Sequence, residues 1–244
     1  GGNADGAGNS GNSNAHGGGI NNSGNSGISN PTVSNCRISG NYASGYGGGI
    51  GVSSGSITLI NCIISGNSDV IGNIGISTIY LINCTAFGNT SLILNYSSTI
   101  QFTNCIVWGN GPLILSLGNV VFLNSIIQSE IMGFGFDISD PDNKINIDPL
   151  FVDATNGNYR PSLASPAINM GDNAAALPLI DFDGHARILD GTVDIGAFEY
   201  FTLFAGRDTV LCASENMYAL SPALELPGLH ISWAGGNGTF VPND

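Results

Sequence analysis

Apolar residues occupy every second position in five short stretches between residues 31 and 129, and each stretch ends at an asparagine. The positions two and four residues before this asparagine are apolar in every copy. Such a period of two is typical of a β-strand with one buried face. The pattern therefore predicts five strands, which are followed by Asn35, Asn61, Asn83, Asn104 and Asn124.

The apolar positions change their parity at each asparagine, which indicates a corner. After the asparagine, the next apolar positions are one and three residues further on, as in Cys62 and Ile64. Asparagine tolerates the left-handed backbone conformation that a one-residue corner requires. The five asparagines follow one another in steps of 26, 22, 21 and 20 residues. A repeat of this length without helical periodicity predicts a solenoid of strands.

Stacking of the coils predicts two columns of identical side chains. Coils about 4.8 Å apart would bring the amides of the five corner asparagines within hydrogen-bonding distance, as a ladder. The Gly-Asn pair that ends each copy, as in Gly66-Asn67, predicts a second corner. The second column contains buried thiols that act as small apolar side chains, because in-register neighbours rarely reach disulfide geometry. Its members are Cys36, Cys62, Cys84 and Cys105.

The repeats resemble those of right-handed parallel β-helix proteins, in which asparagine ladders and stacked Cys, Ile and Val are familiar. The phrase Gly47-Gly48-Gly49-Ile50 after Ser39-Gly40-Asn41 resembles the repeats of bacterial surface β-helix proteins, including polymorphic outer-membrane proteins. Residues 10–20 repeat this phrase, so we expect an earlier coil there and natural sequence before residue 1. The resemblance implies a right-handed parallel β-helix over residues 1–145.

Two further segments carry other resemblances. The phrases Ile147-Asp148-Pro149-Leu150-Phe151 and Asp194-Ile195-Gly196-Ala197-Phe198-Glu199-Tyr200 resemble the end of choice-of-anchor Q proteins, which are secreted and surface-attached bacterial proteins. That resemblance implies that residues 146–200 close the C-terminal end of the β-helix. Residues 201–244, with Trp233 on an expected inner strand, resemble the first half of an immunoglobulin-like or PKD-like module of large Bacteroidota adhesins, including gliding-type ones. Further domains are thus expected on both sides.

Charge is scarce and unevenly distributed. Only 9% of the 244 residues are charged, against roughly 25% in an average soluble domain. Residues 1–129 contain only Asp5, Asp69 and Arg37, so most of the net charge of −13 lies in residues 130–244. Without a basic patch, nucleic acid and anionic membrane surfaces are not expected partners. No apolar stretch reaches the roughly 18 residues that membrane insertion by a helix needs.

Candidate binding chemistry is limited to three places. Asp137, Asp140, Asp142 and Asp148 form an oxygen-rich segment that fits Ca²⁺, although Asp-Pro-Asp-Asn is equally good turn chemistry. No other cofactor is expected. Phe87 and Trp108, one coil apart on an outward column, form either a platform for a sugar ring or a surface covered by the C-terminal segment. Arg187 lies among several Asp residues and is expected to form a structural ion pair, with Asp194 as the candidate partner.

These features predict a non-catalytic segment of a secreted cell-surface adhesin or structural surface fibre. The expected partners are glycans or other surface proteins, and the expected location is extracellular. Two alternatives remain. One is a polysaccharide lyase or glycoside hydrolase, for which the coils offer few carboxylates and the single base Arg37. The other is a self-assembling filament subunit.

Overall fold

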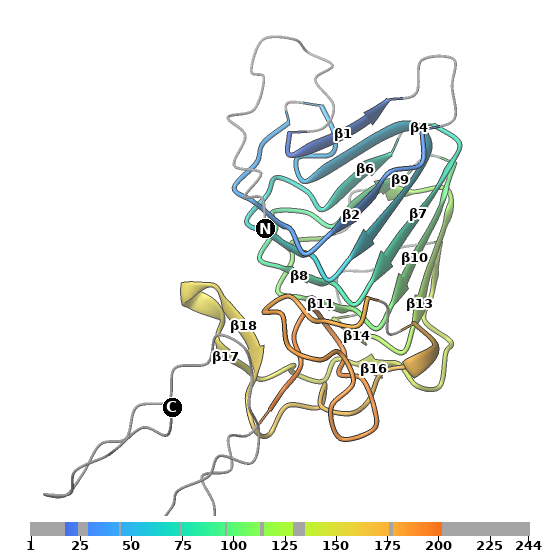
Figure 1. Cartoon of the computed structure of the whole chain (residues 1–244). Coiled ribbons are helices and arrows are strands. Elements are labelled where there is room, and N and C mark those ends of the chain that lie inside the picture. Colours follow the sequence, from blue (N-terminus) through green and yellow to red (C-terminus); the bar gives the residue numbers. More distant parts are fainter. Residues whose placement is uncertain are drawn as a thin grey trace, which may run out of the picture. The chain divides into compact units, whose positions relative to one another are not determined.

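The computed structural model describes residues 18–23, 29–43, 45–73, 75–95, 97–112, 115–128, 135–175 and 178–201. These residues form an all-β structure with a parallel β-solenoid of about four turns (Figure 1). The predicted solenoid is therefore confirmed. The expected coil before residue 18 and the expected immunoglobulin-like or PKD-like module, including Trp233, lie outside the described residues.

Each full coil contributes one strand to each of three faces, and the strands within a face are parallel to one another. The first face contains β1 (Ile20–Ser23), the start of β4 (Ile50–Ile60), β6 (Ile71–Asn73), β9 (Ile93–Asn95) and β12 (Leu115–Ser116). The second contains β2 (Thr32–Ser34), the rest of β4, β7 (Ser77–Ile82), β10 (Thr99–Thr103), β13 (Asn119–Leu123) and β15 (Phe136–Asp137). Because β4 belongs to both faces, they join as one ten-stranded sheet.

The third face is a separate six-stranded sheet. It contains β3 (Arg37–Ser39), β5 (Ile63–Ser65), β8 (Thr85–Phe87), β11 (Ile106–Trp108), β14 (Ile126–Ile127) and β16 (Lys144–Ile145). The apolar columns stay in register from coil to coil, as in the pairing of Leu81 with Phe102 and of Phe102 with Phe122. The rings of Phe102 and Phe122 are fully buried and stack with their centroids 4.6 Å apart. The core is thus a set of continuous columns inside the solenoid.

The corner asparagines adopt the left-handed conformation. Their φ angles are 51° for Asn35, Asn61 and Asn83, 53° for Asn104 and 46° for Asn124. Each of these residues separates a strand of the second face from a strand of the six-stranded sheet. The corner therefore explains the change of parity in the sequence.

Residues 146–200, named the flank segment, follow the last coil. They contain the antiparallel pair β17 (Phe151–Asp153) and β18 (Asn158–Pro161), with the short 3₁₀ helices η2 (Ala154–Asn156) and η3 (Asn173–Ala175). The segment packs on the outer face of the six-stranded sheet, where Ile63 is buried against Tyr159, Ala197 and Phe198. Figure 1 shows the orange part of the chain beside β11 and β14.

This position differs from the expected closure of the C-terminal end. The strands that follow β13 and β14 in the stack are β15 and β16, which belong to residues 135–145. The flank segment contacts several coils along one side, because the outer face of the six-stranded sheet is itself apolar. Burying such a face removes apolar area from water, at roughly 25 cal/mol per Å². Its outward residues are Ile63, Phe87, Ile106, Trp108 and Ile126.

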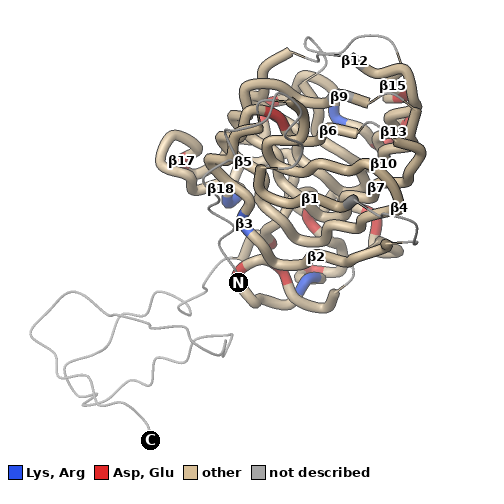
Figure 2. The backbone as a smooth tube through the Cα atoms, turned by 90° about the horizontal axis from the view of Figure 1, so that it is seen from above, with Lys and Arg blue, Asp and Glu red and all other residues tan. Residues whose placement is uncertain are grey.

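Charged residues are sparse along the coils (Figure 2). No helix in the described part of the chain has the length and hydropathy needed to span a membrane.

Candidate functional site

The continuous amide ladder is formed by the second corner, not by the first. Asn41, Asn67, Asn89 and Asn110 each follow a corner glycine and are buried. The side-chain amides of Asn41, Asn67 and Asn89 each donate to Oδ1 of the next asparagine, at 3.0, 3.0 and 2.8 Å. The backbone N–H groups of the same residues donate to the same oxygens at 2.9, 3.0 and 3.1 Å. The Gly-Asn pairs were the sequence signal for this ladder.

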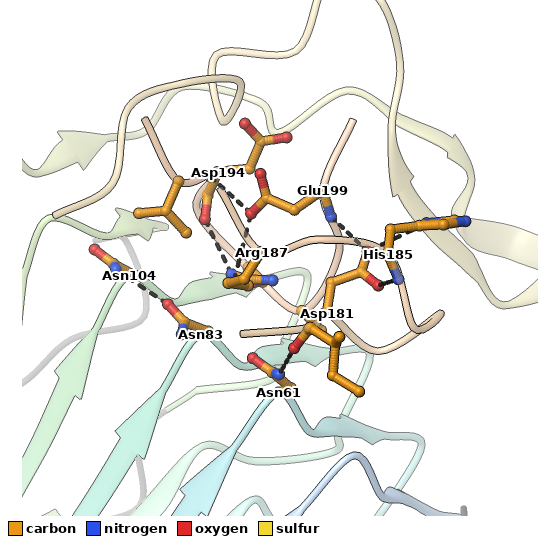
Figure 3. Close-up of polar contacts among 12 residues, drawn as sticks. Asn61, Asn83, Asn104, Asp181, His185, Arg187, Asp194 and Glu199 are labelled. Carbon is orange, nitrogen blue, oxygen red and sulfur yellow. Dashed lines mark hydrogen bonds and ion pairs between the residues drawn. The ribbon is translucent and has the colours of Figure 1, made fainter. Parts of the chain in front are cut away.

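Three first-corner asparagines, Asn61, Asn83 and Asn104, instead bind the flank segment, which corrects the predicted continuous ladder (Figure 3). The Nδ2 atoms of Asn61 and Asn83 donate to the carbonyls of Ile180 and Ala175, at 2.6 and 3.1 Å. Asn104 Nδ2 donates to the carbonyl of Asp172 at 3.0 Å and to Asn83 Oδ1, also at 3.0 Å. Asn83 and Asn104 thus also form an amide pair within the first-corner column. Left-handed corners direct these side chains outward, so they are available to the chain that packs there.

The cysteine column is buried and contains no disulfide among the described residues. Cys62, Cys84 and Cys105 are buried, and Cys36 at the N-terminal edge is half-buried. Hydrogen bonding to Cys84 and burial raise the pKa of the Cys62 thiol, and burial raises that of Cys84. Thiolate is the reactive form of cysteine, so these groups are chemically protected.

We expect this column to resist alkylation in the native protein. Cys36 should react with iodoacetamide at least about 100-fold faster than Cys62, Cys84 and Cys105, because only Cys36 is partly accessible. Peptide mapping after timed labelling gives the rate at each residue. In urea the four rates should become similar, and comparable rates in the native protein would contradict the buried column.

The carboxylates that were predicted to bind Ca²⁺ form local turns instead of a cluster. Asp137 Oδ1 accepts from the N–H and the hydroxyl of Ser139 at 3.0 and 2.6 Å, which lowers the pKa of Asp137. Asp140 accepts from the N–H of Asp142 at 2.9 Å, and Asp148 from that of Leu150 at 2.8 Å. No three of these four side chains form a group with ligand atoms within 4.8 Å of one another. The turn interpretation fits these contacts.

Another group, Asp181, Asp183 and His185, does bring three ligand atoms within 4.8 Å in the described part of the chain. Its oxygens already have protein partners. Asp181 accepts from the N–H groups of Asp183, His185 and Glu199 at 2.8–2.9 Å. Asp183 accepts two bonds of 2.6 Å from the Arg160 guanidinium. The neighbouring positive charge and these partners indicate a structural turn rather than a metal centre.

Arg187 is almost fully buried within the flank segment, and its partner is Glu199 (Figure 3). Its Nε lies 3.4 Å from Glu199 Oε1, while Nη2 donates to the backbone carbonyls of Asp194, at 3.1 Å, and Gly196. The predicted partner Asp194 contacts Arg187 through that carbonyl, and its carboxylate accepts from the N–H groups of Asn169 and Tyr200, both at 2.6 Å. Glu199 was not identified from the sequence, where its signal is an acidic residue inside an apolar stretch.

Burial dominates the electrostatics of this cluster. It raises the pKa of Glu199 to about 8, with a smaller contribution from the negative charge of Asp194. Burial also raises the pKa of Asp194 and lowers that of Arg187. The stability of the folded flank segment therefore depends on the protonation state of these groups.

We expect the free energy of unfolding to fall as the pH rises from about 5 to 9. The pKa of Glu199 is raised in the folded state, so its contribution is complete below the unfolded pKa of 4.5 and is lost as the pH passes about 8. The loss is on the order of a few kcal/mol, since each pKa unit corresponds to about 1.4 kcal/mol. Urea unfolding across this pH range measures it.

Glu199→Gln imitates the protonated carboxyl and should remove much of this slope. The variant should match the wild type near pH 5 and exceed its stability near pH 9. Asp142→Asn, which changes an exposed carboxylate, is the control and should keep the wild-type slope. Equal slopes for wild type and Glu199→Gln would rule out this origin of the pH dependence.

Asp69 and Arg37, the two charged residues in the described chain before residue 129, also have structural partners. Asp69 is buried, and it accepts from the N–H groups of Gly47 and Gly48 at 2.6 and 3.0 Å. Burial raises the pKa of Asp69. The guanidinium of Arg37 lies 5.7 Å from the ring centroid of Tyr159 and donates to the Gly157 carbonyl at 3.5 Å.

The outward aromatic residues border a depression between the six-stranded sheet and the flank segment. The ring of Phe87 packs against those of Phe151 and Tyr159, with centroid distances of 5.6 and 5.2 Å. The flank segment thus covers Phe87 in part. The depression beside it has a volume of about 310 Å³ and is named the flank groove. Its lining residues are Phe87, Trp108, Asp148, Leu150, Phe151 and Ala154.

Comparisons of the chain with protein-family models and with curated proteins found no match.

Proposed function

We propose that the chain is a rigid, non-catalytic segment of a secreted cell-surface protein, which acts as an adhesin or a structural surface fibre. The observation that supports this proposal is the continuous bonding between coils. Each coil contributes in-register strands and one buried asparagine to a stack that extends along the solenoid. Such a stack gives reach and stiffness with few charged residues.

The contacts of Asp69 and Arg37 also support a non-catalytic function. Asp69 is engaged by backbone N–H groups inside the coils, and Arg37 contacts the flank segment. A lyase would need a base and stabilising charges directed at its substrate. The resemblances to choice-of-anchor Q proteins and to PKD-containing Bacteroidota adhesins support the surface location and further modules in the same protein.

Two measurements test the proposal. Antibodies against the chain should label intact producing cells as strongly as permeabilised ones. Incubation with a panel of polysaccharides and Ca²⁺ should release neither new reducing ends nor unsaturated products. Turnover that disappears on changing Arg37 or Asp148 would establish an enzyme instead, and regular polymers of the isolated chain would favour a filament subunit.

A further inference from the structure

The flank groove combines aromatic walls with one carboxylate, which is a composition suited to a sugar. Trp108 and Phe87 are register partners on β11 and β8, and both are half-buried. Trp108 and Phe151 of the flank segment pack against the same buried cluster, which includes Ile106 and Ile195. The groove is therefore assembled from two coils and a segment that follows them by about 40 residues in the sequence, so it exists only when the flank segment is docked.

Asp148 supplies the polar function at the rim of the flank groove. Its side chain is exposed, and one oxygen, Oδ1, accepts from the N–H of Leu150 at 2.8 Å. That bond fixes the orientation of the carboxylate. No protein donor bonds to Oδ2 among the described residues, so this oxygen can accept from a ligand hydroxyl.

The backbone at the rim is held in an uncommon conformation. Leu150 has a φ of 51°, in the left-handed region that a leucine rarely adopts, and its side chain is 40% exposed. The bond from its N–H to Asp148 and the bond of 2.9 Å from the Ser162 N–H to its carbonyl keep it there. Residues held in sparsely populated conformations gather at ligand sites more often than elsewhere.

We propose that the flank groove binds one neutral monosaccharide unit of a glycan. One face of the sugar ring stacks on Trp108, and a sugar hydroxyl donates a hydrogen bond to the Asp148 carboxylate. None of the basic side chains in the described chain lines the groove, and the surrounding flank segment is acidic, so carboxylated or sulfated sugars are disfavoured. The volume of about 310 Å³ lies at the lower end of the usual range for ligand sites, about 300–1,000 Å³. This proposal rests on the surface function above and names the ligand class for it.

The test is calorimetric titration of the whole chain with methyl glycosides of glucose, galactose, mannose and N-acetylglucosamine. We expect at least one of them to bind with a Kd near the millimolar range, and methyl glucuronoside to bind at least about 10-fold more weakly. Trp108→Ala should weaken binding about 10-fold or more, since ring stacking and burial are lost. Asp148→Asn, an exposed and nearly isosteric change, should weaken it about threefold to tenfold.

Matched controls change the same residue types outside the groove. Tyr80→Ala, an exposed aromatic on β7, and Asp142→Asn should leave the Kd unchanged. The proposal is overturned if no neutral glycoside binds at tens of millimolar, if binding survives both groove variants, or if only apolar peptides bind. Product analysis of the same samples separates the two proposals. Turnover would refute the non-catalytic function, whereas absent binding without turnover would refute only the groove.

Discussion

Asn89→Ala should destabilise the protein by about 3–5 kcal/mol, because it interrupts the buried amide ladder in its middle. The Asn89 carboxamide accepts from the backbone and side-chain N–H groups of Asn67 and donates to Asn110 Oδ1 and the Ile64 carbonyl. Alanine leaves these groups buried and without their partner, and each costs about 1–3 kcal/mol. Urea unfolding monitored by far-ultraviolet circular dichroism gives the difference.

Asn119→Ala is the matched control for this experiment. Asn119 is an exposed asparagine on β13, and its backbone N–H, which the substitution keeps, donates to the Ser98 carbonyl at 3.0 Å. We expect a change within about 0.5 kcal/mol, as for other surface substitutions. If Asn89→Ala costs no more than Asn119→Ala, the ladder is not a major source of stability.

Arg187→Met should destabilise the docked flank segment by about 3–5 kcal/mol. Methionine is of similar length but leaves the Asp194 carboxylate buried without its positive neighbour, and two backbone carbonyls lose their donor. Removing one member of a buried charge group typically costs this much. In a Trp233→Phe background, the fluorescence of Trp108 reports the contact with the flank segment, and we expect it to change at a lower urea concentration than the circular dichroism of the coils.

Arg160→Met tests whether the burial of the Arg187 charge is the cause of the large effect expected for Arg187→Met. Arg160 also belongs to the flank segment, and it forms an ion pair of 2.6 Å with Asp183, but 49% of its side chain is exposed. An exposed pair contributes about 1 kcal/mol or less. Combining Arg187→Met with Glu199→Gln should restore part of the stability, because the buried Glu199 carboxyl no longer has to take up a proton on folding. Equal effects of the two arginine substitutions would contradict the proposed importance of the buried charge group.

The repeat in the sequence predicted the solenoid because every coil repeats the same local rule. Period-two apolar residues, an asparagine corner and a Gly-Asn corner are local features, and they identified the strands on either side of the first corner and its left-handed asparagines. The predicted column forms the Asn83–Asn104 amide pair, but the continuous ladder lies in the other column, because its position depends on which corner faces the interior. Both corners contain asparagine, and side-chain direction at a left-handed residue is not visible in the spacing.

The candidate site was less predictable because it depends on contacts between distant residues. Phe87 and Tyr159 are separated by 72 positions, and Asn104 and Asp172 by 68. No period relates the flank segment to the coils, so its docking side could not be derived from the repeat. The sequence identified Phe87, Trp108, Asp148 and Arg187 one by one, whereas the partner Glu199 and the flank groove follow only from the packing.

The flank segment has a consequence for cooperativity. In a solenoid each coil contacts only its neighbours, so coils can in principle be lost one at a time from an end. Here Asn61, Asn83 and Asn104, from three consecutive coils, all donate to one continuous covalent segment. Separating any of these coils also disturbs the segment that the other two hold. Fraying from the ends should therefore stop at these coils, and their amide protons should exchange with solvent together, as a single unit.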